Sequence, residues 1–117
     1  MNCGTKGKLH GRFGEFLMKR IVSQDLQRIY NGLTENEREK FRGSTILFTG
    51  GAGFLGFYFI CFLTRYQQEL GVQKVICLDN FQVGCPQWLK RLSGEGKVEL
   101  HKFNVITDDI ANVPGAE

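Results

Sequence analysis

The order of apolar and polar segments along the chain predicts strands and helices in alternation. The apolar runs at 45–49 and 74–78 are continuous, as expected of parallel strands that are covered on both faces, and a third strand is predicted at 97–103. Helices are predicted from a glycine-rich turn at 50–56 to about Leu70, where Gly71 ends the helix, and over 86–92. This alternation predicts an α/β fold with a parallel sheet, right-handed crossovers and the strand order 3-2-1.

Two short helices are predicted ahead of the first strand. Apolar residues recur with helical spacing from Ile21 to about Asn31, and Thr34 stands three positions before Glu37. In that arrangement, which is a capping box, the threonine hydroxyl accepts the Glu37 amide and the Glu37 carboxylate accepts the Thr34 amide. A second helix should therefore run from about residue 35 to 41. We expect residues 18–43 to form a helical arm that packs on the main domain.

The charge of the chain is concentrated at its amino terminus. The net charge of the whole chain is +3. The first 20 residues hold five lysines and arginines against one acid, Glu15, whereas the rest of the chain is nearly neutral. Four glycines lie among these basic residues, so we expect residues 1–17 to be a flexible basic leader. The remainder carries no basic patch that would favour nucleic acid.

Membrane and metal chemistry are not favoured by the sequence. The longest apolar run, residues 54–63, is about half the roughly 20 residues that a membrane span needs. The four cysteines include no CxxC pair, and His10 and His101 are isolated, so we expect no metal site. With no signal peptide and with Cys61 and Cys77 inside apolar runs, we expect a reducing, cytoplasmic location.

The glycine-rich turn is the strongest candidate for a functional site. Its glycines at 50, 53 and 56 have the spacing GxxGxxG between a predicted strand and a predicted helix. Gly50 allows a sharp turn with a positive φ, Gly53 leaves room for a pyrophosphate, and Gly56 allows close packing of helix and strand. The amides between about Ala52 and Leu55 would then point at the phosphates at the helix amino terminus.

An acid at the end of the second strand indicates which dinucleotide this turn would bind. Asp79 follows Gly56 at about the 20-residue offset that such sites use. A carboxylate there accepts hydrogen bonds from the adenosine ribose and repels a 2′-phosphate, so it favours NAD over NADP. The rival, a P-loop, lacks the Gly-Lys-Ser/Thr that would follow the glycines. Two further acids, the adjacent Asp108 and Asp109, are typical of a solvated turn or a helix cap.

These residues resemble the NAD-dependent epimerase/dehydratase family, extended short-chain dehydrogenase/reductases that modify nucleotide-sugars. The resemblance lies in TGGAGFLG at 49–56, VICLDNF at 75–81, Gly84 and HKFNVITDD at 101–109. It implies that residues 44–117 are the amino-terminal part of an NAD(P)-binding Rossmann domain with a partial, three-stranded sheet.

The resemblance also implies roles for individual residues. Phe54 and Leu55 would supply pyrophosphate-binding amides, alongside Gly50, Gly53 and Gly56 of the turn. Asp79 and Asn80 would hold the ribose, with Phe81 beside them. Asn104 and Val105 would border the adenine, although the family usually has Asp at the position of Asn104.

The function implied is the NAD-binding portion of a nucleotide-sugar epimerase, dehydratase or decarboxylase. Such enzymes oxidise the sugar transiently by hydride transfer to bound NAD. The catalytic Tyr-x-x-x-Lys does not occur here, because no tyrosine has a lysine four residues later, so we expect a fragment that is inactive by itself. The alternative is a non-catalytic dinucleotide-binding or regulatory module. An unpaired edge of the first strand predicts self-association, a homodimer included.

Overall fold

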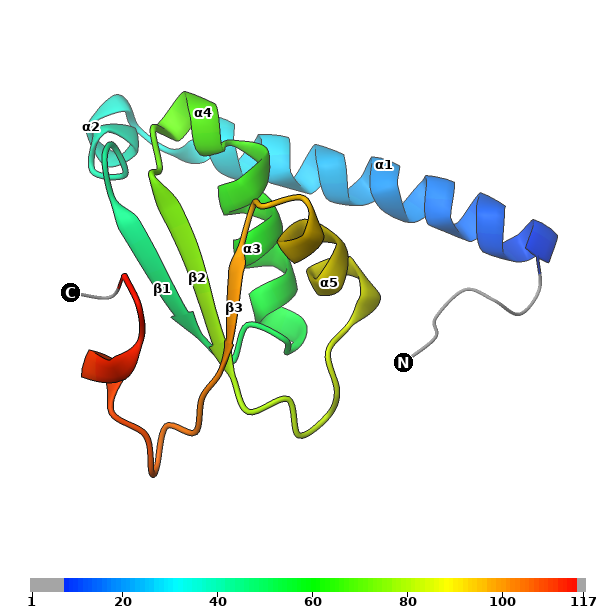
Figure 1. The fold of residues 1–117 in the computed structure, drawn as a ribbon. Helices are drawn as coiled ribbons and strands as arrows, with labels where there is room; N and C mark the ends of the chain where they lie inside the picture. Colours follow the sequence, from blue (N-terminus) through cyan, green and yellow to red (C-terminus); the bar gives the residue numbers. More distant parts are fainter. Residues whose placement is uncertain (1–7, 116–117) are drawn as a thin grey trace.

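A three-stranded parallel sheet lies at the centre of the molecule (Figure 1). The computed structural model describes residues 8–115, with side chains from Lys19 onward. The strands are β1 (Thr45–Thr49), β2 (Lys74–Asp79) and β3 (Glu99–Lys102). β2 lies between β1 and β3, which is the expected order 3-2-1 read from the opposite edge. The α/β class and the parallel sheet predicted from the sequence are confirmed.

The third strand is shorter than predicted. Its ladder with β2 begins where Ile76 pairs with Glu99 and ends where Asp79 pairs with Lys102. The predicted strand, 97–103, extends beyond this ladder at both ends. Val98 is buried in the core although it precedes the strand, because an apolar side chain can pack without belonging to a hydrogen-bonded ladder.

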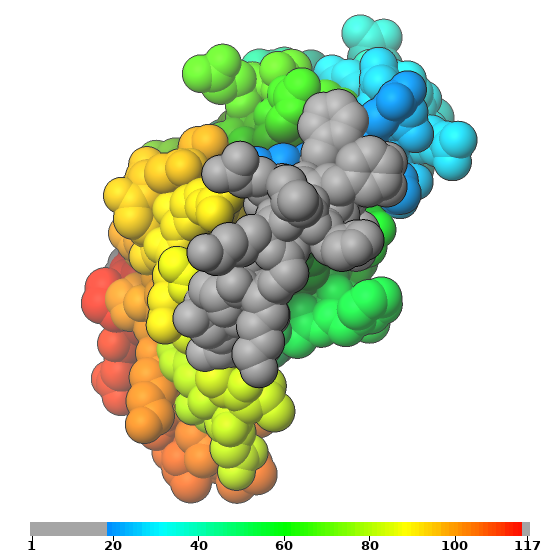
Figure 2. Space-filling view, turned by 90° about the vertical axis from the view of Figure 1, so that its right-hand side faces the viewer, coloured from blue at the N-terminus to red at the C-terminus, as the bar shows by residue number. Residues whose placement is uncertain are grey.

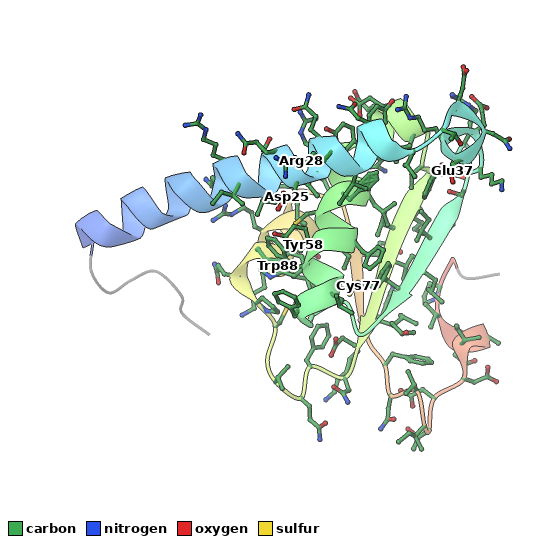
Figure 3. All side chains as sticks on the ribbon, turned by 180° about the vertical axis from the view of Figure 1, so that it is seen from behind. Asp25, Arg28, Glu37, Tyr58, Cys77 and Trp88 are labelled. Atoms are coloured by element: carbon green, nitrogen blue, oxygen red, sulfur yellow. The ribbon has the colours of Figure 1, made fainter. Side chains whose placement is uncertain are left out.

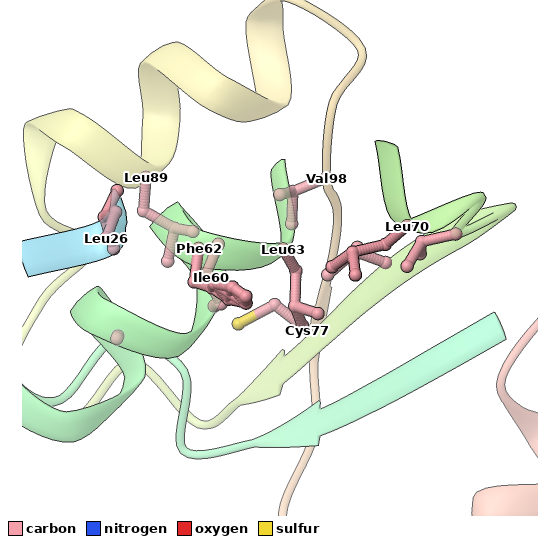
Figure 4. Packing of buried hydrophobic residues seen from close by; sticks show 11 residues of the cluster. Leu26, Ile60, Phe62, Leu63, Leu70, Cys77, Leu89 and Val98 are labelled. Carbon is pink, nitrogen blue, oxygen red and sulfur yellow. The ribbon is translucent and has the colours of Figure 1, made fainter. Parts of the chain in front are cut away.

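One face of the sheet is covered by helices (Figures 1 and 4). These are α1 (Lys8–Gly32), α3 (Phe54–Arg65), α4 (Gln67–Leu70) and α5 (Gln87–Gly94). α3 packs against β2, and α1 crosses over α3. The sequence predicted one helix through residue 70, but α3 ends at Arg65, because the φ of −106° and ψ of 22° at Tyr66 leave the helical region. The buried residues at the centre of this layer include Leu26, Ile60, Phe62, Leu63, Leu70, Cys77, Leu89 and Val98.

The opposite face of the sheet is covered by the segment that follows β3. Ile76 and Leu78 of β2 are both buried there, together with Phe103 and Val113. The 3₁₀ turn η1 (Ile110–Asn112) lies within this segment, on the side of the sheet away from α3 (Figure 1). The continuous apolar sequence of β2 is explained by this cover on both faces.

The first helix is much longer than expected. Its backbone is helical from Lys8 over 25 residues, whereas the sequence predicted a short helix from about Ile21 behind a flexible leader. Residues 8–18 hold glycines at 11 and 14, but most of the others are good helix formers. Adding residues to an existing helix costs little. Residues 1–7 of the predicted leader lie outside the described part of the chain. Neither α1 nor any other described helix is both long and apolar enough to cross a membrane.

The helical arm is attached to the domain by specific contacts. The ring of Tyr30 stacks on Tyr66 with centroids 4.5 Å apart, and the Tyr58 hydroxyl donates to Asp25 at 3.3 Å (Figure 3). Arg38 lies over the Tyr30 ring and donates to the Tyr30 carbonyl oxygen at 2.9 Å. α1 and α2 (Glu35–Glu39) are therefore part of the packed structure.

The predicted capping box begins α2. The Thr34 hydroxyl accepts the Glu37 amide at 3.2 Å, and the Glu37 carboxylate accepts the Thr34 amide at 2.8 Å. The Glu37 carboxylate also accepts the Thr34 hydroxyl at 3.0 Å, and the two hydrogen bonds that it accepts from Thr34 lower the pKa of the Glu37 carboxyl below its ordinary value. α2 ends two residues earlier than predicted, and Gly43 follows with a φ of +71°.

We expect Thr34→Ala to lower the free energy of unfolding by about 1 kcal/mol, the usual cost of losing such a cap. Because the Glu37 pKa is lowered in the folded state, its contribution is complete above the ordinary carboxyl pKa and is lost as the pH falls through the folded value. Urea unfolding as a function of pH measures both effects. Asn36→Ala, an exposed change on the same helix, should be nearly neutral. Equal effects of the two changes would contradict the role of the cap.

The outer edge of β1 borders an apolar groove. The groove encloses about 330 Å³, and none of its lining residues is charged. They are Ile29, Leu33, Phe41, Ile46, Phe48, Tyr58, Phe59, Phe62 and Leu63. Among the described residues no strand pairs with this edge. An uncharged strand edge beside an apolar groove favours association.

We therefore expect the 117-residue chain to dimerise through two antiparallel β1 edges. Phe59, which is 54% exposed at the groove, would be buried on association. Phe59→Lys should raise the dimer dissociation constant at least about tenfold, because burying one aromatic side chain contributes about 1.5–3 kcal/mol. Ile21→Lys, at an equally exposed apolar position outside the groove, is the control. Sedimentation velocity over a concentration series measures both, and a monomer at every concentration would contradict the expectation.

Candidate functional site

The glycine turn lies at the carboxyl edge of the sheet, between β1 and α3. Gly50 follows β1 directly and has a φ of +70°, the left-handed conformation that the sequence predicted for it. The loops after β2 and β3 leave the sheet at the same edge, because carboxyl ends of parallel strands lie together. These loops form the lower end of the molecule in Figures 1 and 2, in lime and orange.

The turn is fixed to the end of β2 by hydrogen bonds. The Gly50 amide donates to the Leu78 carbonyl oxygen at 2.8 Å, and the Ala52 amide donates to Asp79 Oδ2 at 3.0 Å. The Gly53 amide donates to the Gly50 carbonyl oxygen at 3.1 Å. The expectation that amides from Ala52 onward face a phosphate is therefore wrong for Ala52 and Gly53, whose donors are already used within the protein.

The amides that remain available are those at the start of α3. The first helical hydrogen bond from this end joins the Phe57 amide to the Gly53 carbonyl oxygen at 3.2 Å. Phe54, Leu55 and Gly56 therefore have no carbonyl of an earlier turn to bond with. The partial positive charge of the helix dipole adds to these three donors. The resemblance had implied this role for Phe54 and Leu55.

Gly53 and Gly56 both lie close to backbone atoms of the turn, and at Gly56 a side chain would collide with them. A Cβ at Gly53 would lie 3.3 Å from the Gly50 carbonyl oxygen, which is a tight contact. A Cβ at Gly56 would lie 2.6 Å from the carbonyl carbon of Gly51 and 2.7 Å from its Cα. Gly56 thus allows close packing as expected, but the partner is the turn itself and not the strand.

Gly51 was not predicted to matter, yet the structure requires it. Gly51 is buried, and a Cβ there would lie 2.7 Å from Ile60 Cδ1 and closer still to Cys77 Sγ. The GxxGxxG spacing gives Gly51 no role, because it describes contacts with the ligand and the helix only. The available signal was the apolar Cys77 two residues before Asp79, but its position under the turn depends on the three-dimensional packing.

Asp79 is a buried carboxylate whose two oxygens are both engaged. It is 9% exposed, and while Oδ2 accepts the Ala52 amide, Oδ1 accepts the Phe81 amide at 2.8 Å. An ionised carboxylate has about four acceptor positions, so two remain for the hydroxyls of a ribose. The side chain lies beside the glycine turn, as the sequence reasoning required, and it also orders that turn.

The residues after Asp79 form a strained turn. Phe81 has a φ of +56°, which is rare for a residue with a bulky side chain. Its amide bond to Asp79 and the bond from the Gly84 amide to the Phe81 carbonyl oxygen, at 2.9 Å, hold this conformation. Asn80 is exposed, and its Oδ1 accepts the Gln82 amide at 3.0 Å. Strain of this kind is commonly found at ligand-binding sites.

The loop after β3 is ordered by its own polar side chains. Asn104 Oδ1 accepts the Ile106 amide at 2.9 Å, and the Asn104 amide donates to Asp108 Oδ2 at 2.7 Å. Asp109 caps η1 by accepting the Ala111 amide at 2.9 Å. The prediction that the two acids form a turn and a cap is confirmed. Asn104 thus lies in this loop and its Oδ1 is already used, leaving its amide NH₂ for a ligand.

Large apolar side chains are exposed around this edge. They come from the first turn of α3 and from the loops after β2 and β3, and each is at least 69% exposed: Phe54, Leu55, Val83, Val105 and Ile106. The sequence did not predict this concentration, although Phe54, Leu55 and Val105 were expected to border the dinucleotide. Apolar side chains around a few polar groups are typical of small-molecule sites.

The thiols of Cys77 and Cys61 are poor nucleophiles at neutral pH. Burial raises the pKa of Cys77 to about 11, with a further contribution from the nearby Asp79 carboxylate, so its thiol is protonated at neutral pH. Burial likewise raises the pKa of Cys61 to about 11. In residues 8–115 no three His, Cys, Asp or Glu side chains gather as metal ligands would.

The edge therefore combines three features: free amides at a helix start, a buried carboxylate beside them and exposed apolar side chains around both. All three come from residues that the chain itself brings together at the ends of β1, β2 and β3. In comparisons with known proteins, no family model, no curated protein and no solved structure matches this chain.

Proposed function

We propose that the chain binds the adenosine diphosphate portion of NAD at the carboxyl edge of the sheet. The observation that carries this proposal is the position of the Asp79 carboxylate. It is bonded to the glycine turn that leads directly into the free α3 amides. The amides of Phe54, Leu55 and Gly56 would hold the pyrophosphate. The two free acceptor positions of Asp79 would hold the ribose hydroxyls, with Asn80 and Phe81 beside them.

Three further features support the fit of the dinucleotide. A Cβ at Gly53 would lie 3.3 Å from the Gly50 carbonyl oxygen, so glycine at this position keeps the turn tight just before the α3 amides. Val105 and the Asn104 amide would border the adenine, one offering an apolar surface and the other hydrogen-bond donors. The negative charge of Asp79 would repel a 2′-phosphate, which favours NAD over NADP.

We further propose that this site belongs to a nucleotide-sugar epimerase, dehydratase or decarboxylase, on the resemblance of residues 49–56 and 75–81. NAD supplies a hydride acceptor in such enzymes. The 117 residues would contribute binding and orientation of the adenosine half, and they contain no Tyr-x-x-x-Lys to move protons. That same observation favours the second candidate, a non-catalytic dinucleotide-binding or regulatory module.

We expect calorimetry to detect NAD binding to the 117-residue chain, with weaker binding of NADP. Gly53→Val should weaken NAD binding at least about tenfold, because the side chain occupies the space of the pyrophosphate, an effect of about 1.4 kcal/mol or more. Gly94→Ala is the control, because a Cβ there meets nothing within 4 Å. Circular dichroism should be unchanged in both variants. Tighter binding of NADP than NAD, or unaltered NAD affinity of Gly53→Val, would contradict the proposal.

A further inference from the structure

The glycine turn rests directly on one buried side chain of β2, that of Cys77. Cys77 is fully buried, and its sulfur points from the strand toward α3 (Figures 3 and 4). An added Cβ at Gly51 would lie closer to Cys77 Sγ than the 2.7 Å that separates it from Ile60 Cδ1. No space therefore remains between the turn and the thiol.

Three consecutive residues of the turn contact three consecutive residues of β2, two of them through hydrogen bonds. The Gly50 amide bonds with the Leu78 carbonyl oxygen, and the Ala52 amide bonds with the Asp79 carboxylate. Between them, the Gly51 backbone lies directly against the Cys77 side chain, which a Cβ added at Gly51 would meet. Of these three contacts, only the one between Gly51 and Cys77 depends on the size of an apolar side chain.

The position of the α3 amides depends in turn on Gly51. Gly56, in the first turn of α3, packs closely on the Gly51 backbone. A Cβ added at Gly56 would lie 2.6 Å from the Gly51 carbonyl carbon. The start of α3 therefore rests on Gly51, and Gly51 rests on Cys77. A change in the volume at position 77 must move the turn, α3 or both, because packed interiors have little free space.

We propose that Cys77 is a positioning residue of the dinucleotide site: the volume of its side chain sets the height of Gly51, and hence where the Phe54 and Leu55 amides point. This inference rests on the proposed NAD function. It assigns no chemistry to the thiol, which remains protonated and enclosed.

The first test varies the size of residue 77 and measures NAD affinity by calorimetry. Cys77→Leu should weaken NAD binding at least about tenfold, because the larger side chain displaces Gly51 and the start of α3. Cys77→Ser, close to cysteine in size, should lose less affinity than Cys77→Leu. Val75→Leu adds bulk on the same buried face of β2, one strand repeat further from the turn. It should lower the melting temperature while NAD affinity is retained, so it separates destabilisation from displacement of the turn.

The second test is compensation between the two contacting residues. Gly51 does not have a positive φ, so Gly51→Ala adds only the contact with Cys77 and Ile60. Gly51→Ala should weaken NAD binding at least about tenfold. Cys77→Ala removes the sulfur and leaves the Cβ of residue 77 at an ordinary 3.4 Å from the new methyl group. The double variant should therefore bind NAD more tightly than Gly51→Ala does, a non-additive result.

The outcomes separate this inference from the proposed function. If the wild-type chain binds NAD but Cys77→Leu binds it equally well, or the double variant is no better than Gly51→Ala, Cys77 is not a positioning residue. If the wild-type chain does not bind NAD, the proposed function fails and the role of Cys77 in positioning it fails with it. Melting temperatures of the wild-type chain, Gly51→Ala, Cys77→Ala and the double variant then show whether residues 51 and 77 still form a packing pair.

Discussion

Gly56→Ala should destabilise the fold by about 3 kcal/mol and abolish dinucleotide binding. The new methyl group would lie 2.6 Å from the Gly51 carbonyl carbon and 2.7 Å from its Cα. These are backbone atoms, so no side-chain rotation relieves the contact, and the cost should reach the upper end of the usual 1–3 kcal/mol for overpacking. In an exposed helix interior the same change normally stabilises by about 1 kcal/mol.

Gly94→Ala is the matched control for this prediction. Gly94 is the last residue of α5, and a Cβ there meets no atom within 4 Å. We expect it to be neutral or slightly stabilising, with NAD binding unchanged. Urea unfolding of the two variants measures the difference directly. If Gly56→Ala were as stable as Gly94→Ala, α3 would not be packed on the glycine turn.

Asp79→Ala should have the second largest effect, on stability and on binding together. It removes the acceptor for two amides, those of Ala52 and Phe81, in a position that is 9% exposed. Leaving buried donors unsatisfied costs about 1–3 kcal/mol, and we expect roughly 2–3 kcal/mol of unfolding free energy to be lost. NAD affinity should fall by a further 1–3 kcal/mol on the same scale, because the ribose acceptor is lost too.

Asp109→Ala provides the comparison for Asp79. Asp109 accepts the amide two residues later, as Asp79 does, but it is exposed to solvent. Its loss should cost about 1 kcal/mol, the value for an exposed cap, and leave NAD binding intact. Asp79→Asn keeps the shape but removes the charge, so NADP should gain affinity relative to NAD. Equal stability of the Asp79→Ala and Asp109→Ala variants would show that Asp79 does not fix the turn.

The strands and the glycine turn could be predicted because their signals are local. The bounds of β1 and the capping box at Thr34 follow from residues within five positions of one another, and the structure confirms both. The positive φ of Gly50 follows in the same way, from a strand that must turn at once into a helix. Local side-chain and backbone preferences decide these features, so one sequence is enough.

The features that were missed depend on contacts between distant segments. Ala52 and Asp79 are 27 residues apart, and no spacing rule indicates that the Ala52 amide is used by that carboxylate. The need for glycine at 51 depends on Cys77 and Ile60 meeting beneath it. The length of α1 was not predicted, because the glycines at 11 and 14 favoured a flexible leader, although Leu9, Phe13 and Phe16 have helical spacing.

The most direct test of the proposed NAD site is an amide-resolved NMR titration of the 117-residue chain with NAD. We predict that the largest shifts occur at Phe54, Leu55 and Gly56 at the start of α3, and at Asn80 and Phe81 after β2. The amides of α2, at the opposite edge of the sheet, should not shift. Inorganic pyrophosphate should shift the α3 amides and leave the two after β2 largely unchanged. Saturation with NAD without shifts at Phe54 and Leu55, or shifts centred on another part of the chain, would contradict the account.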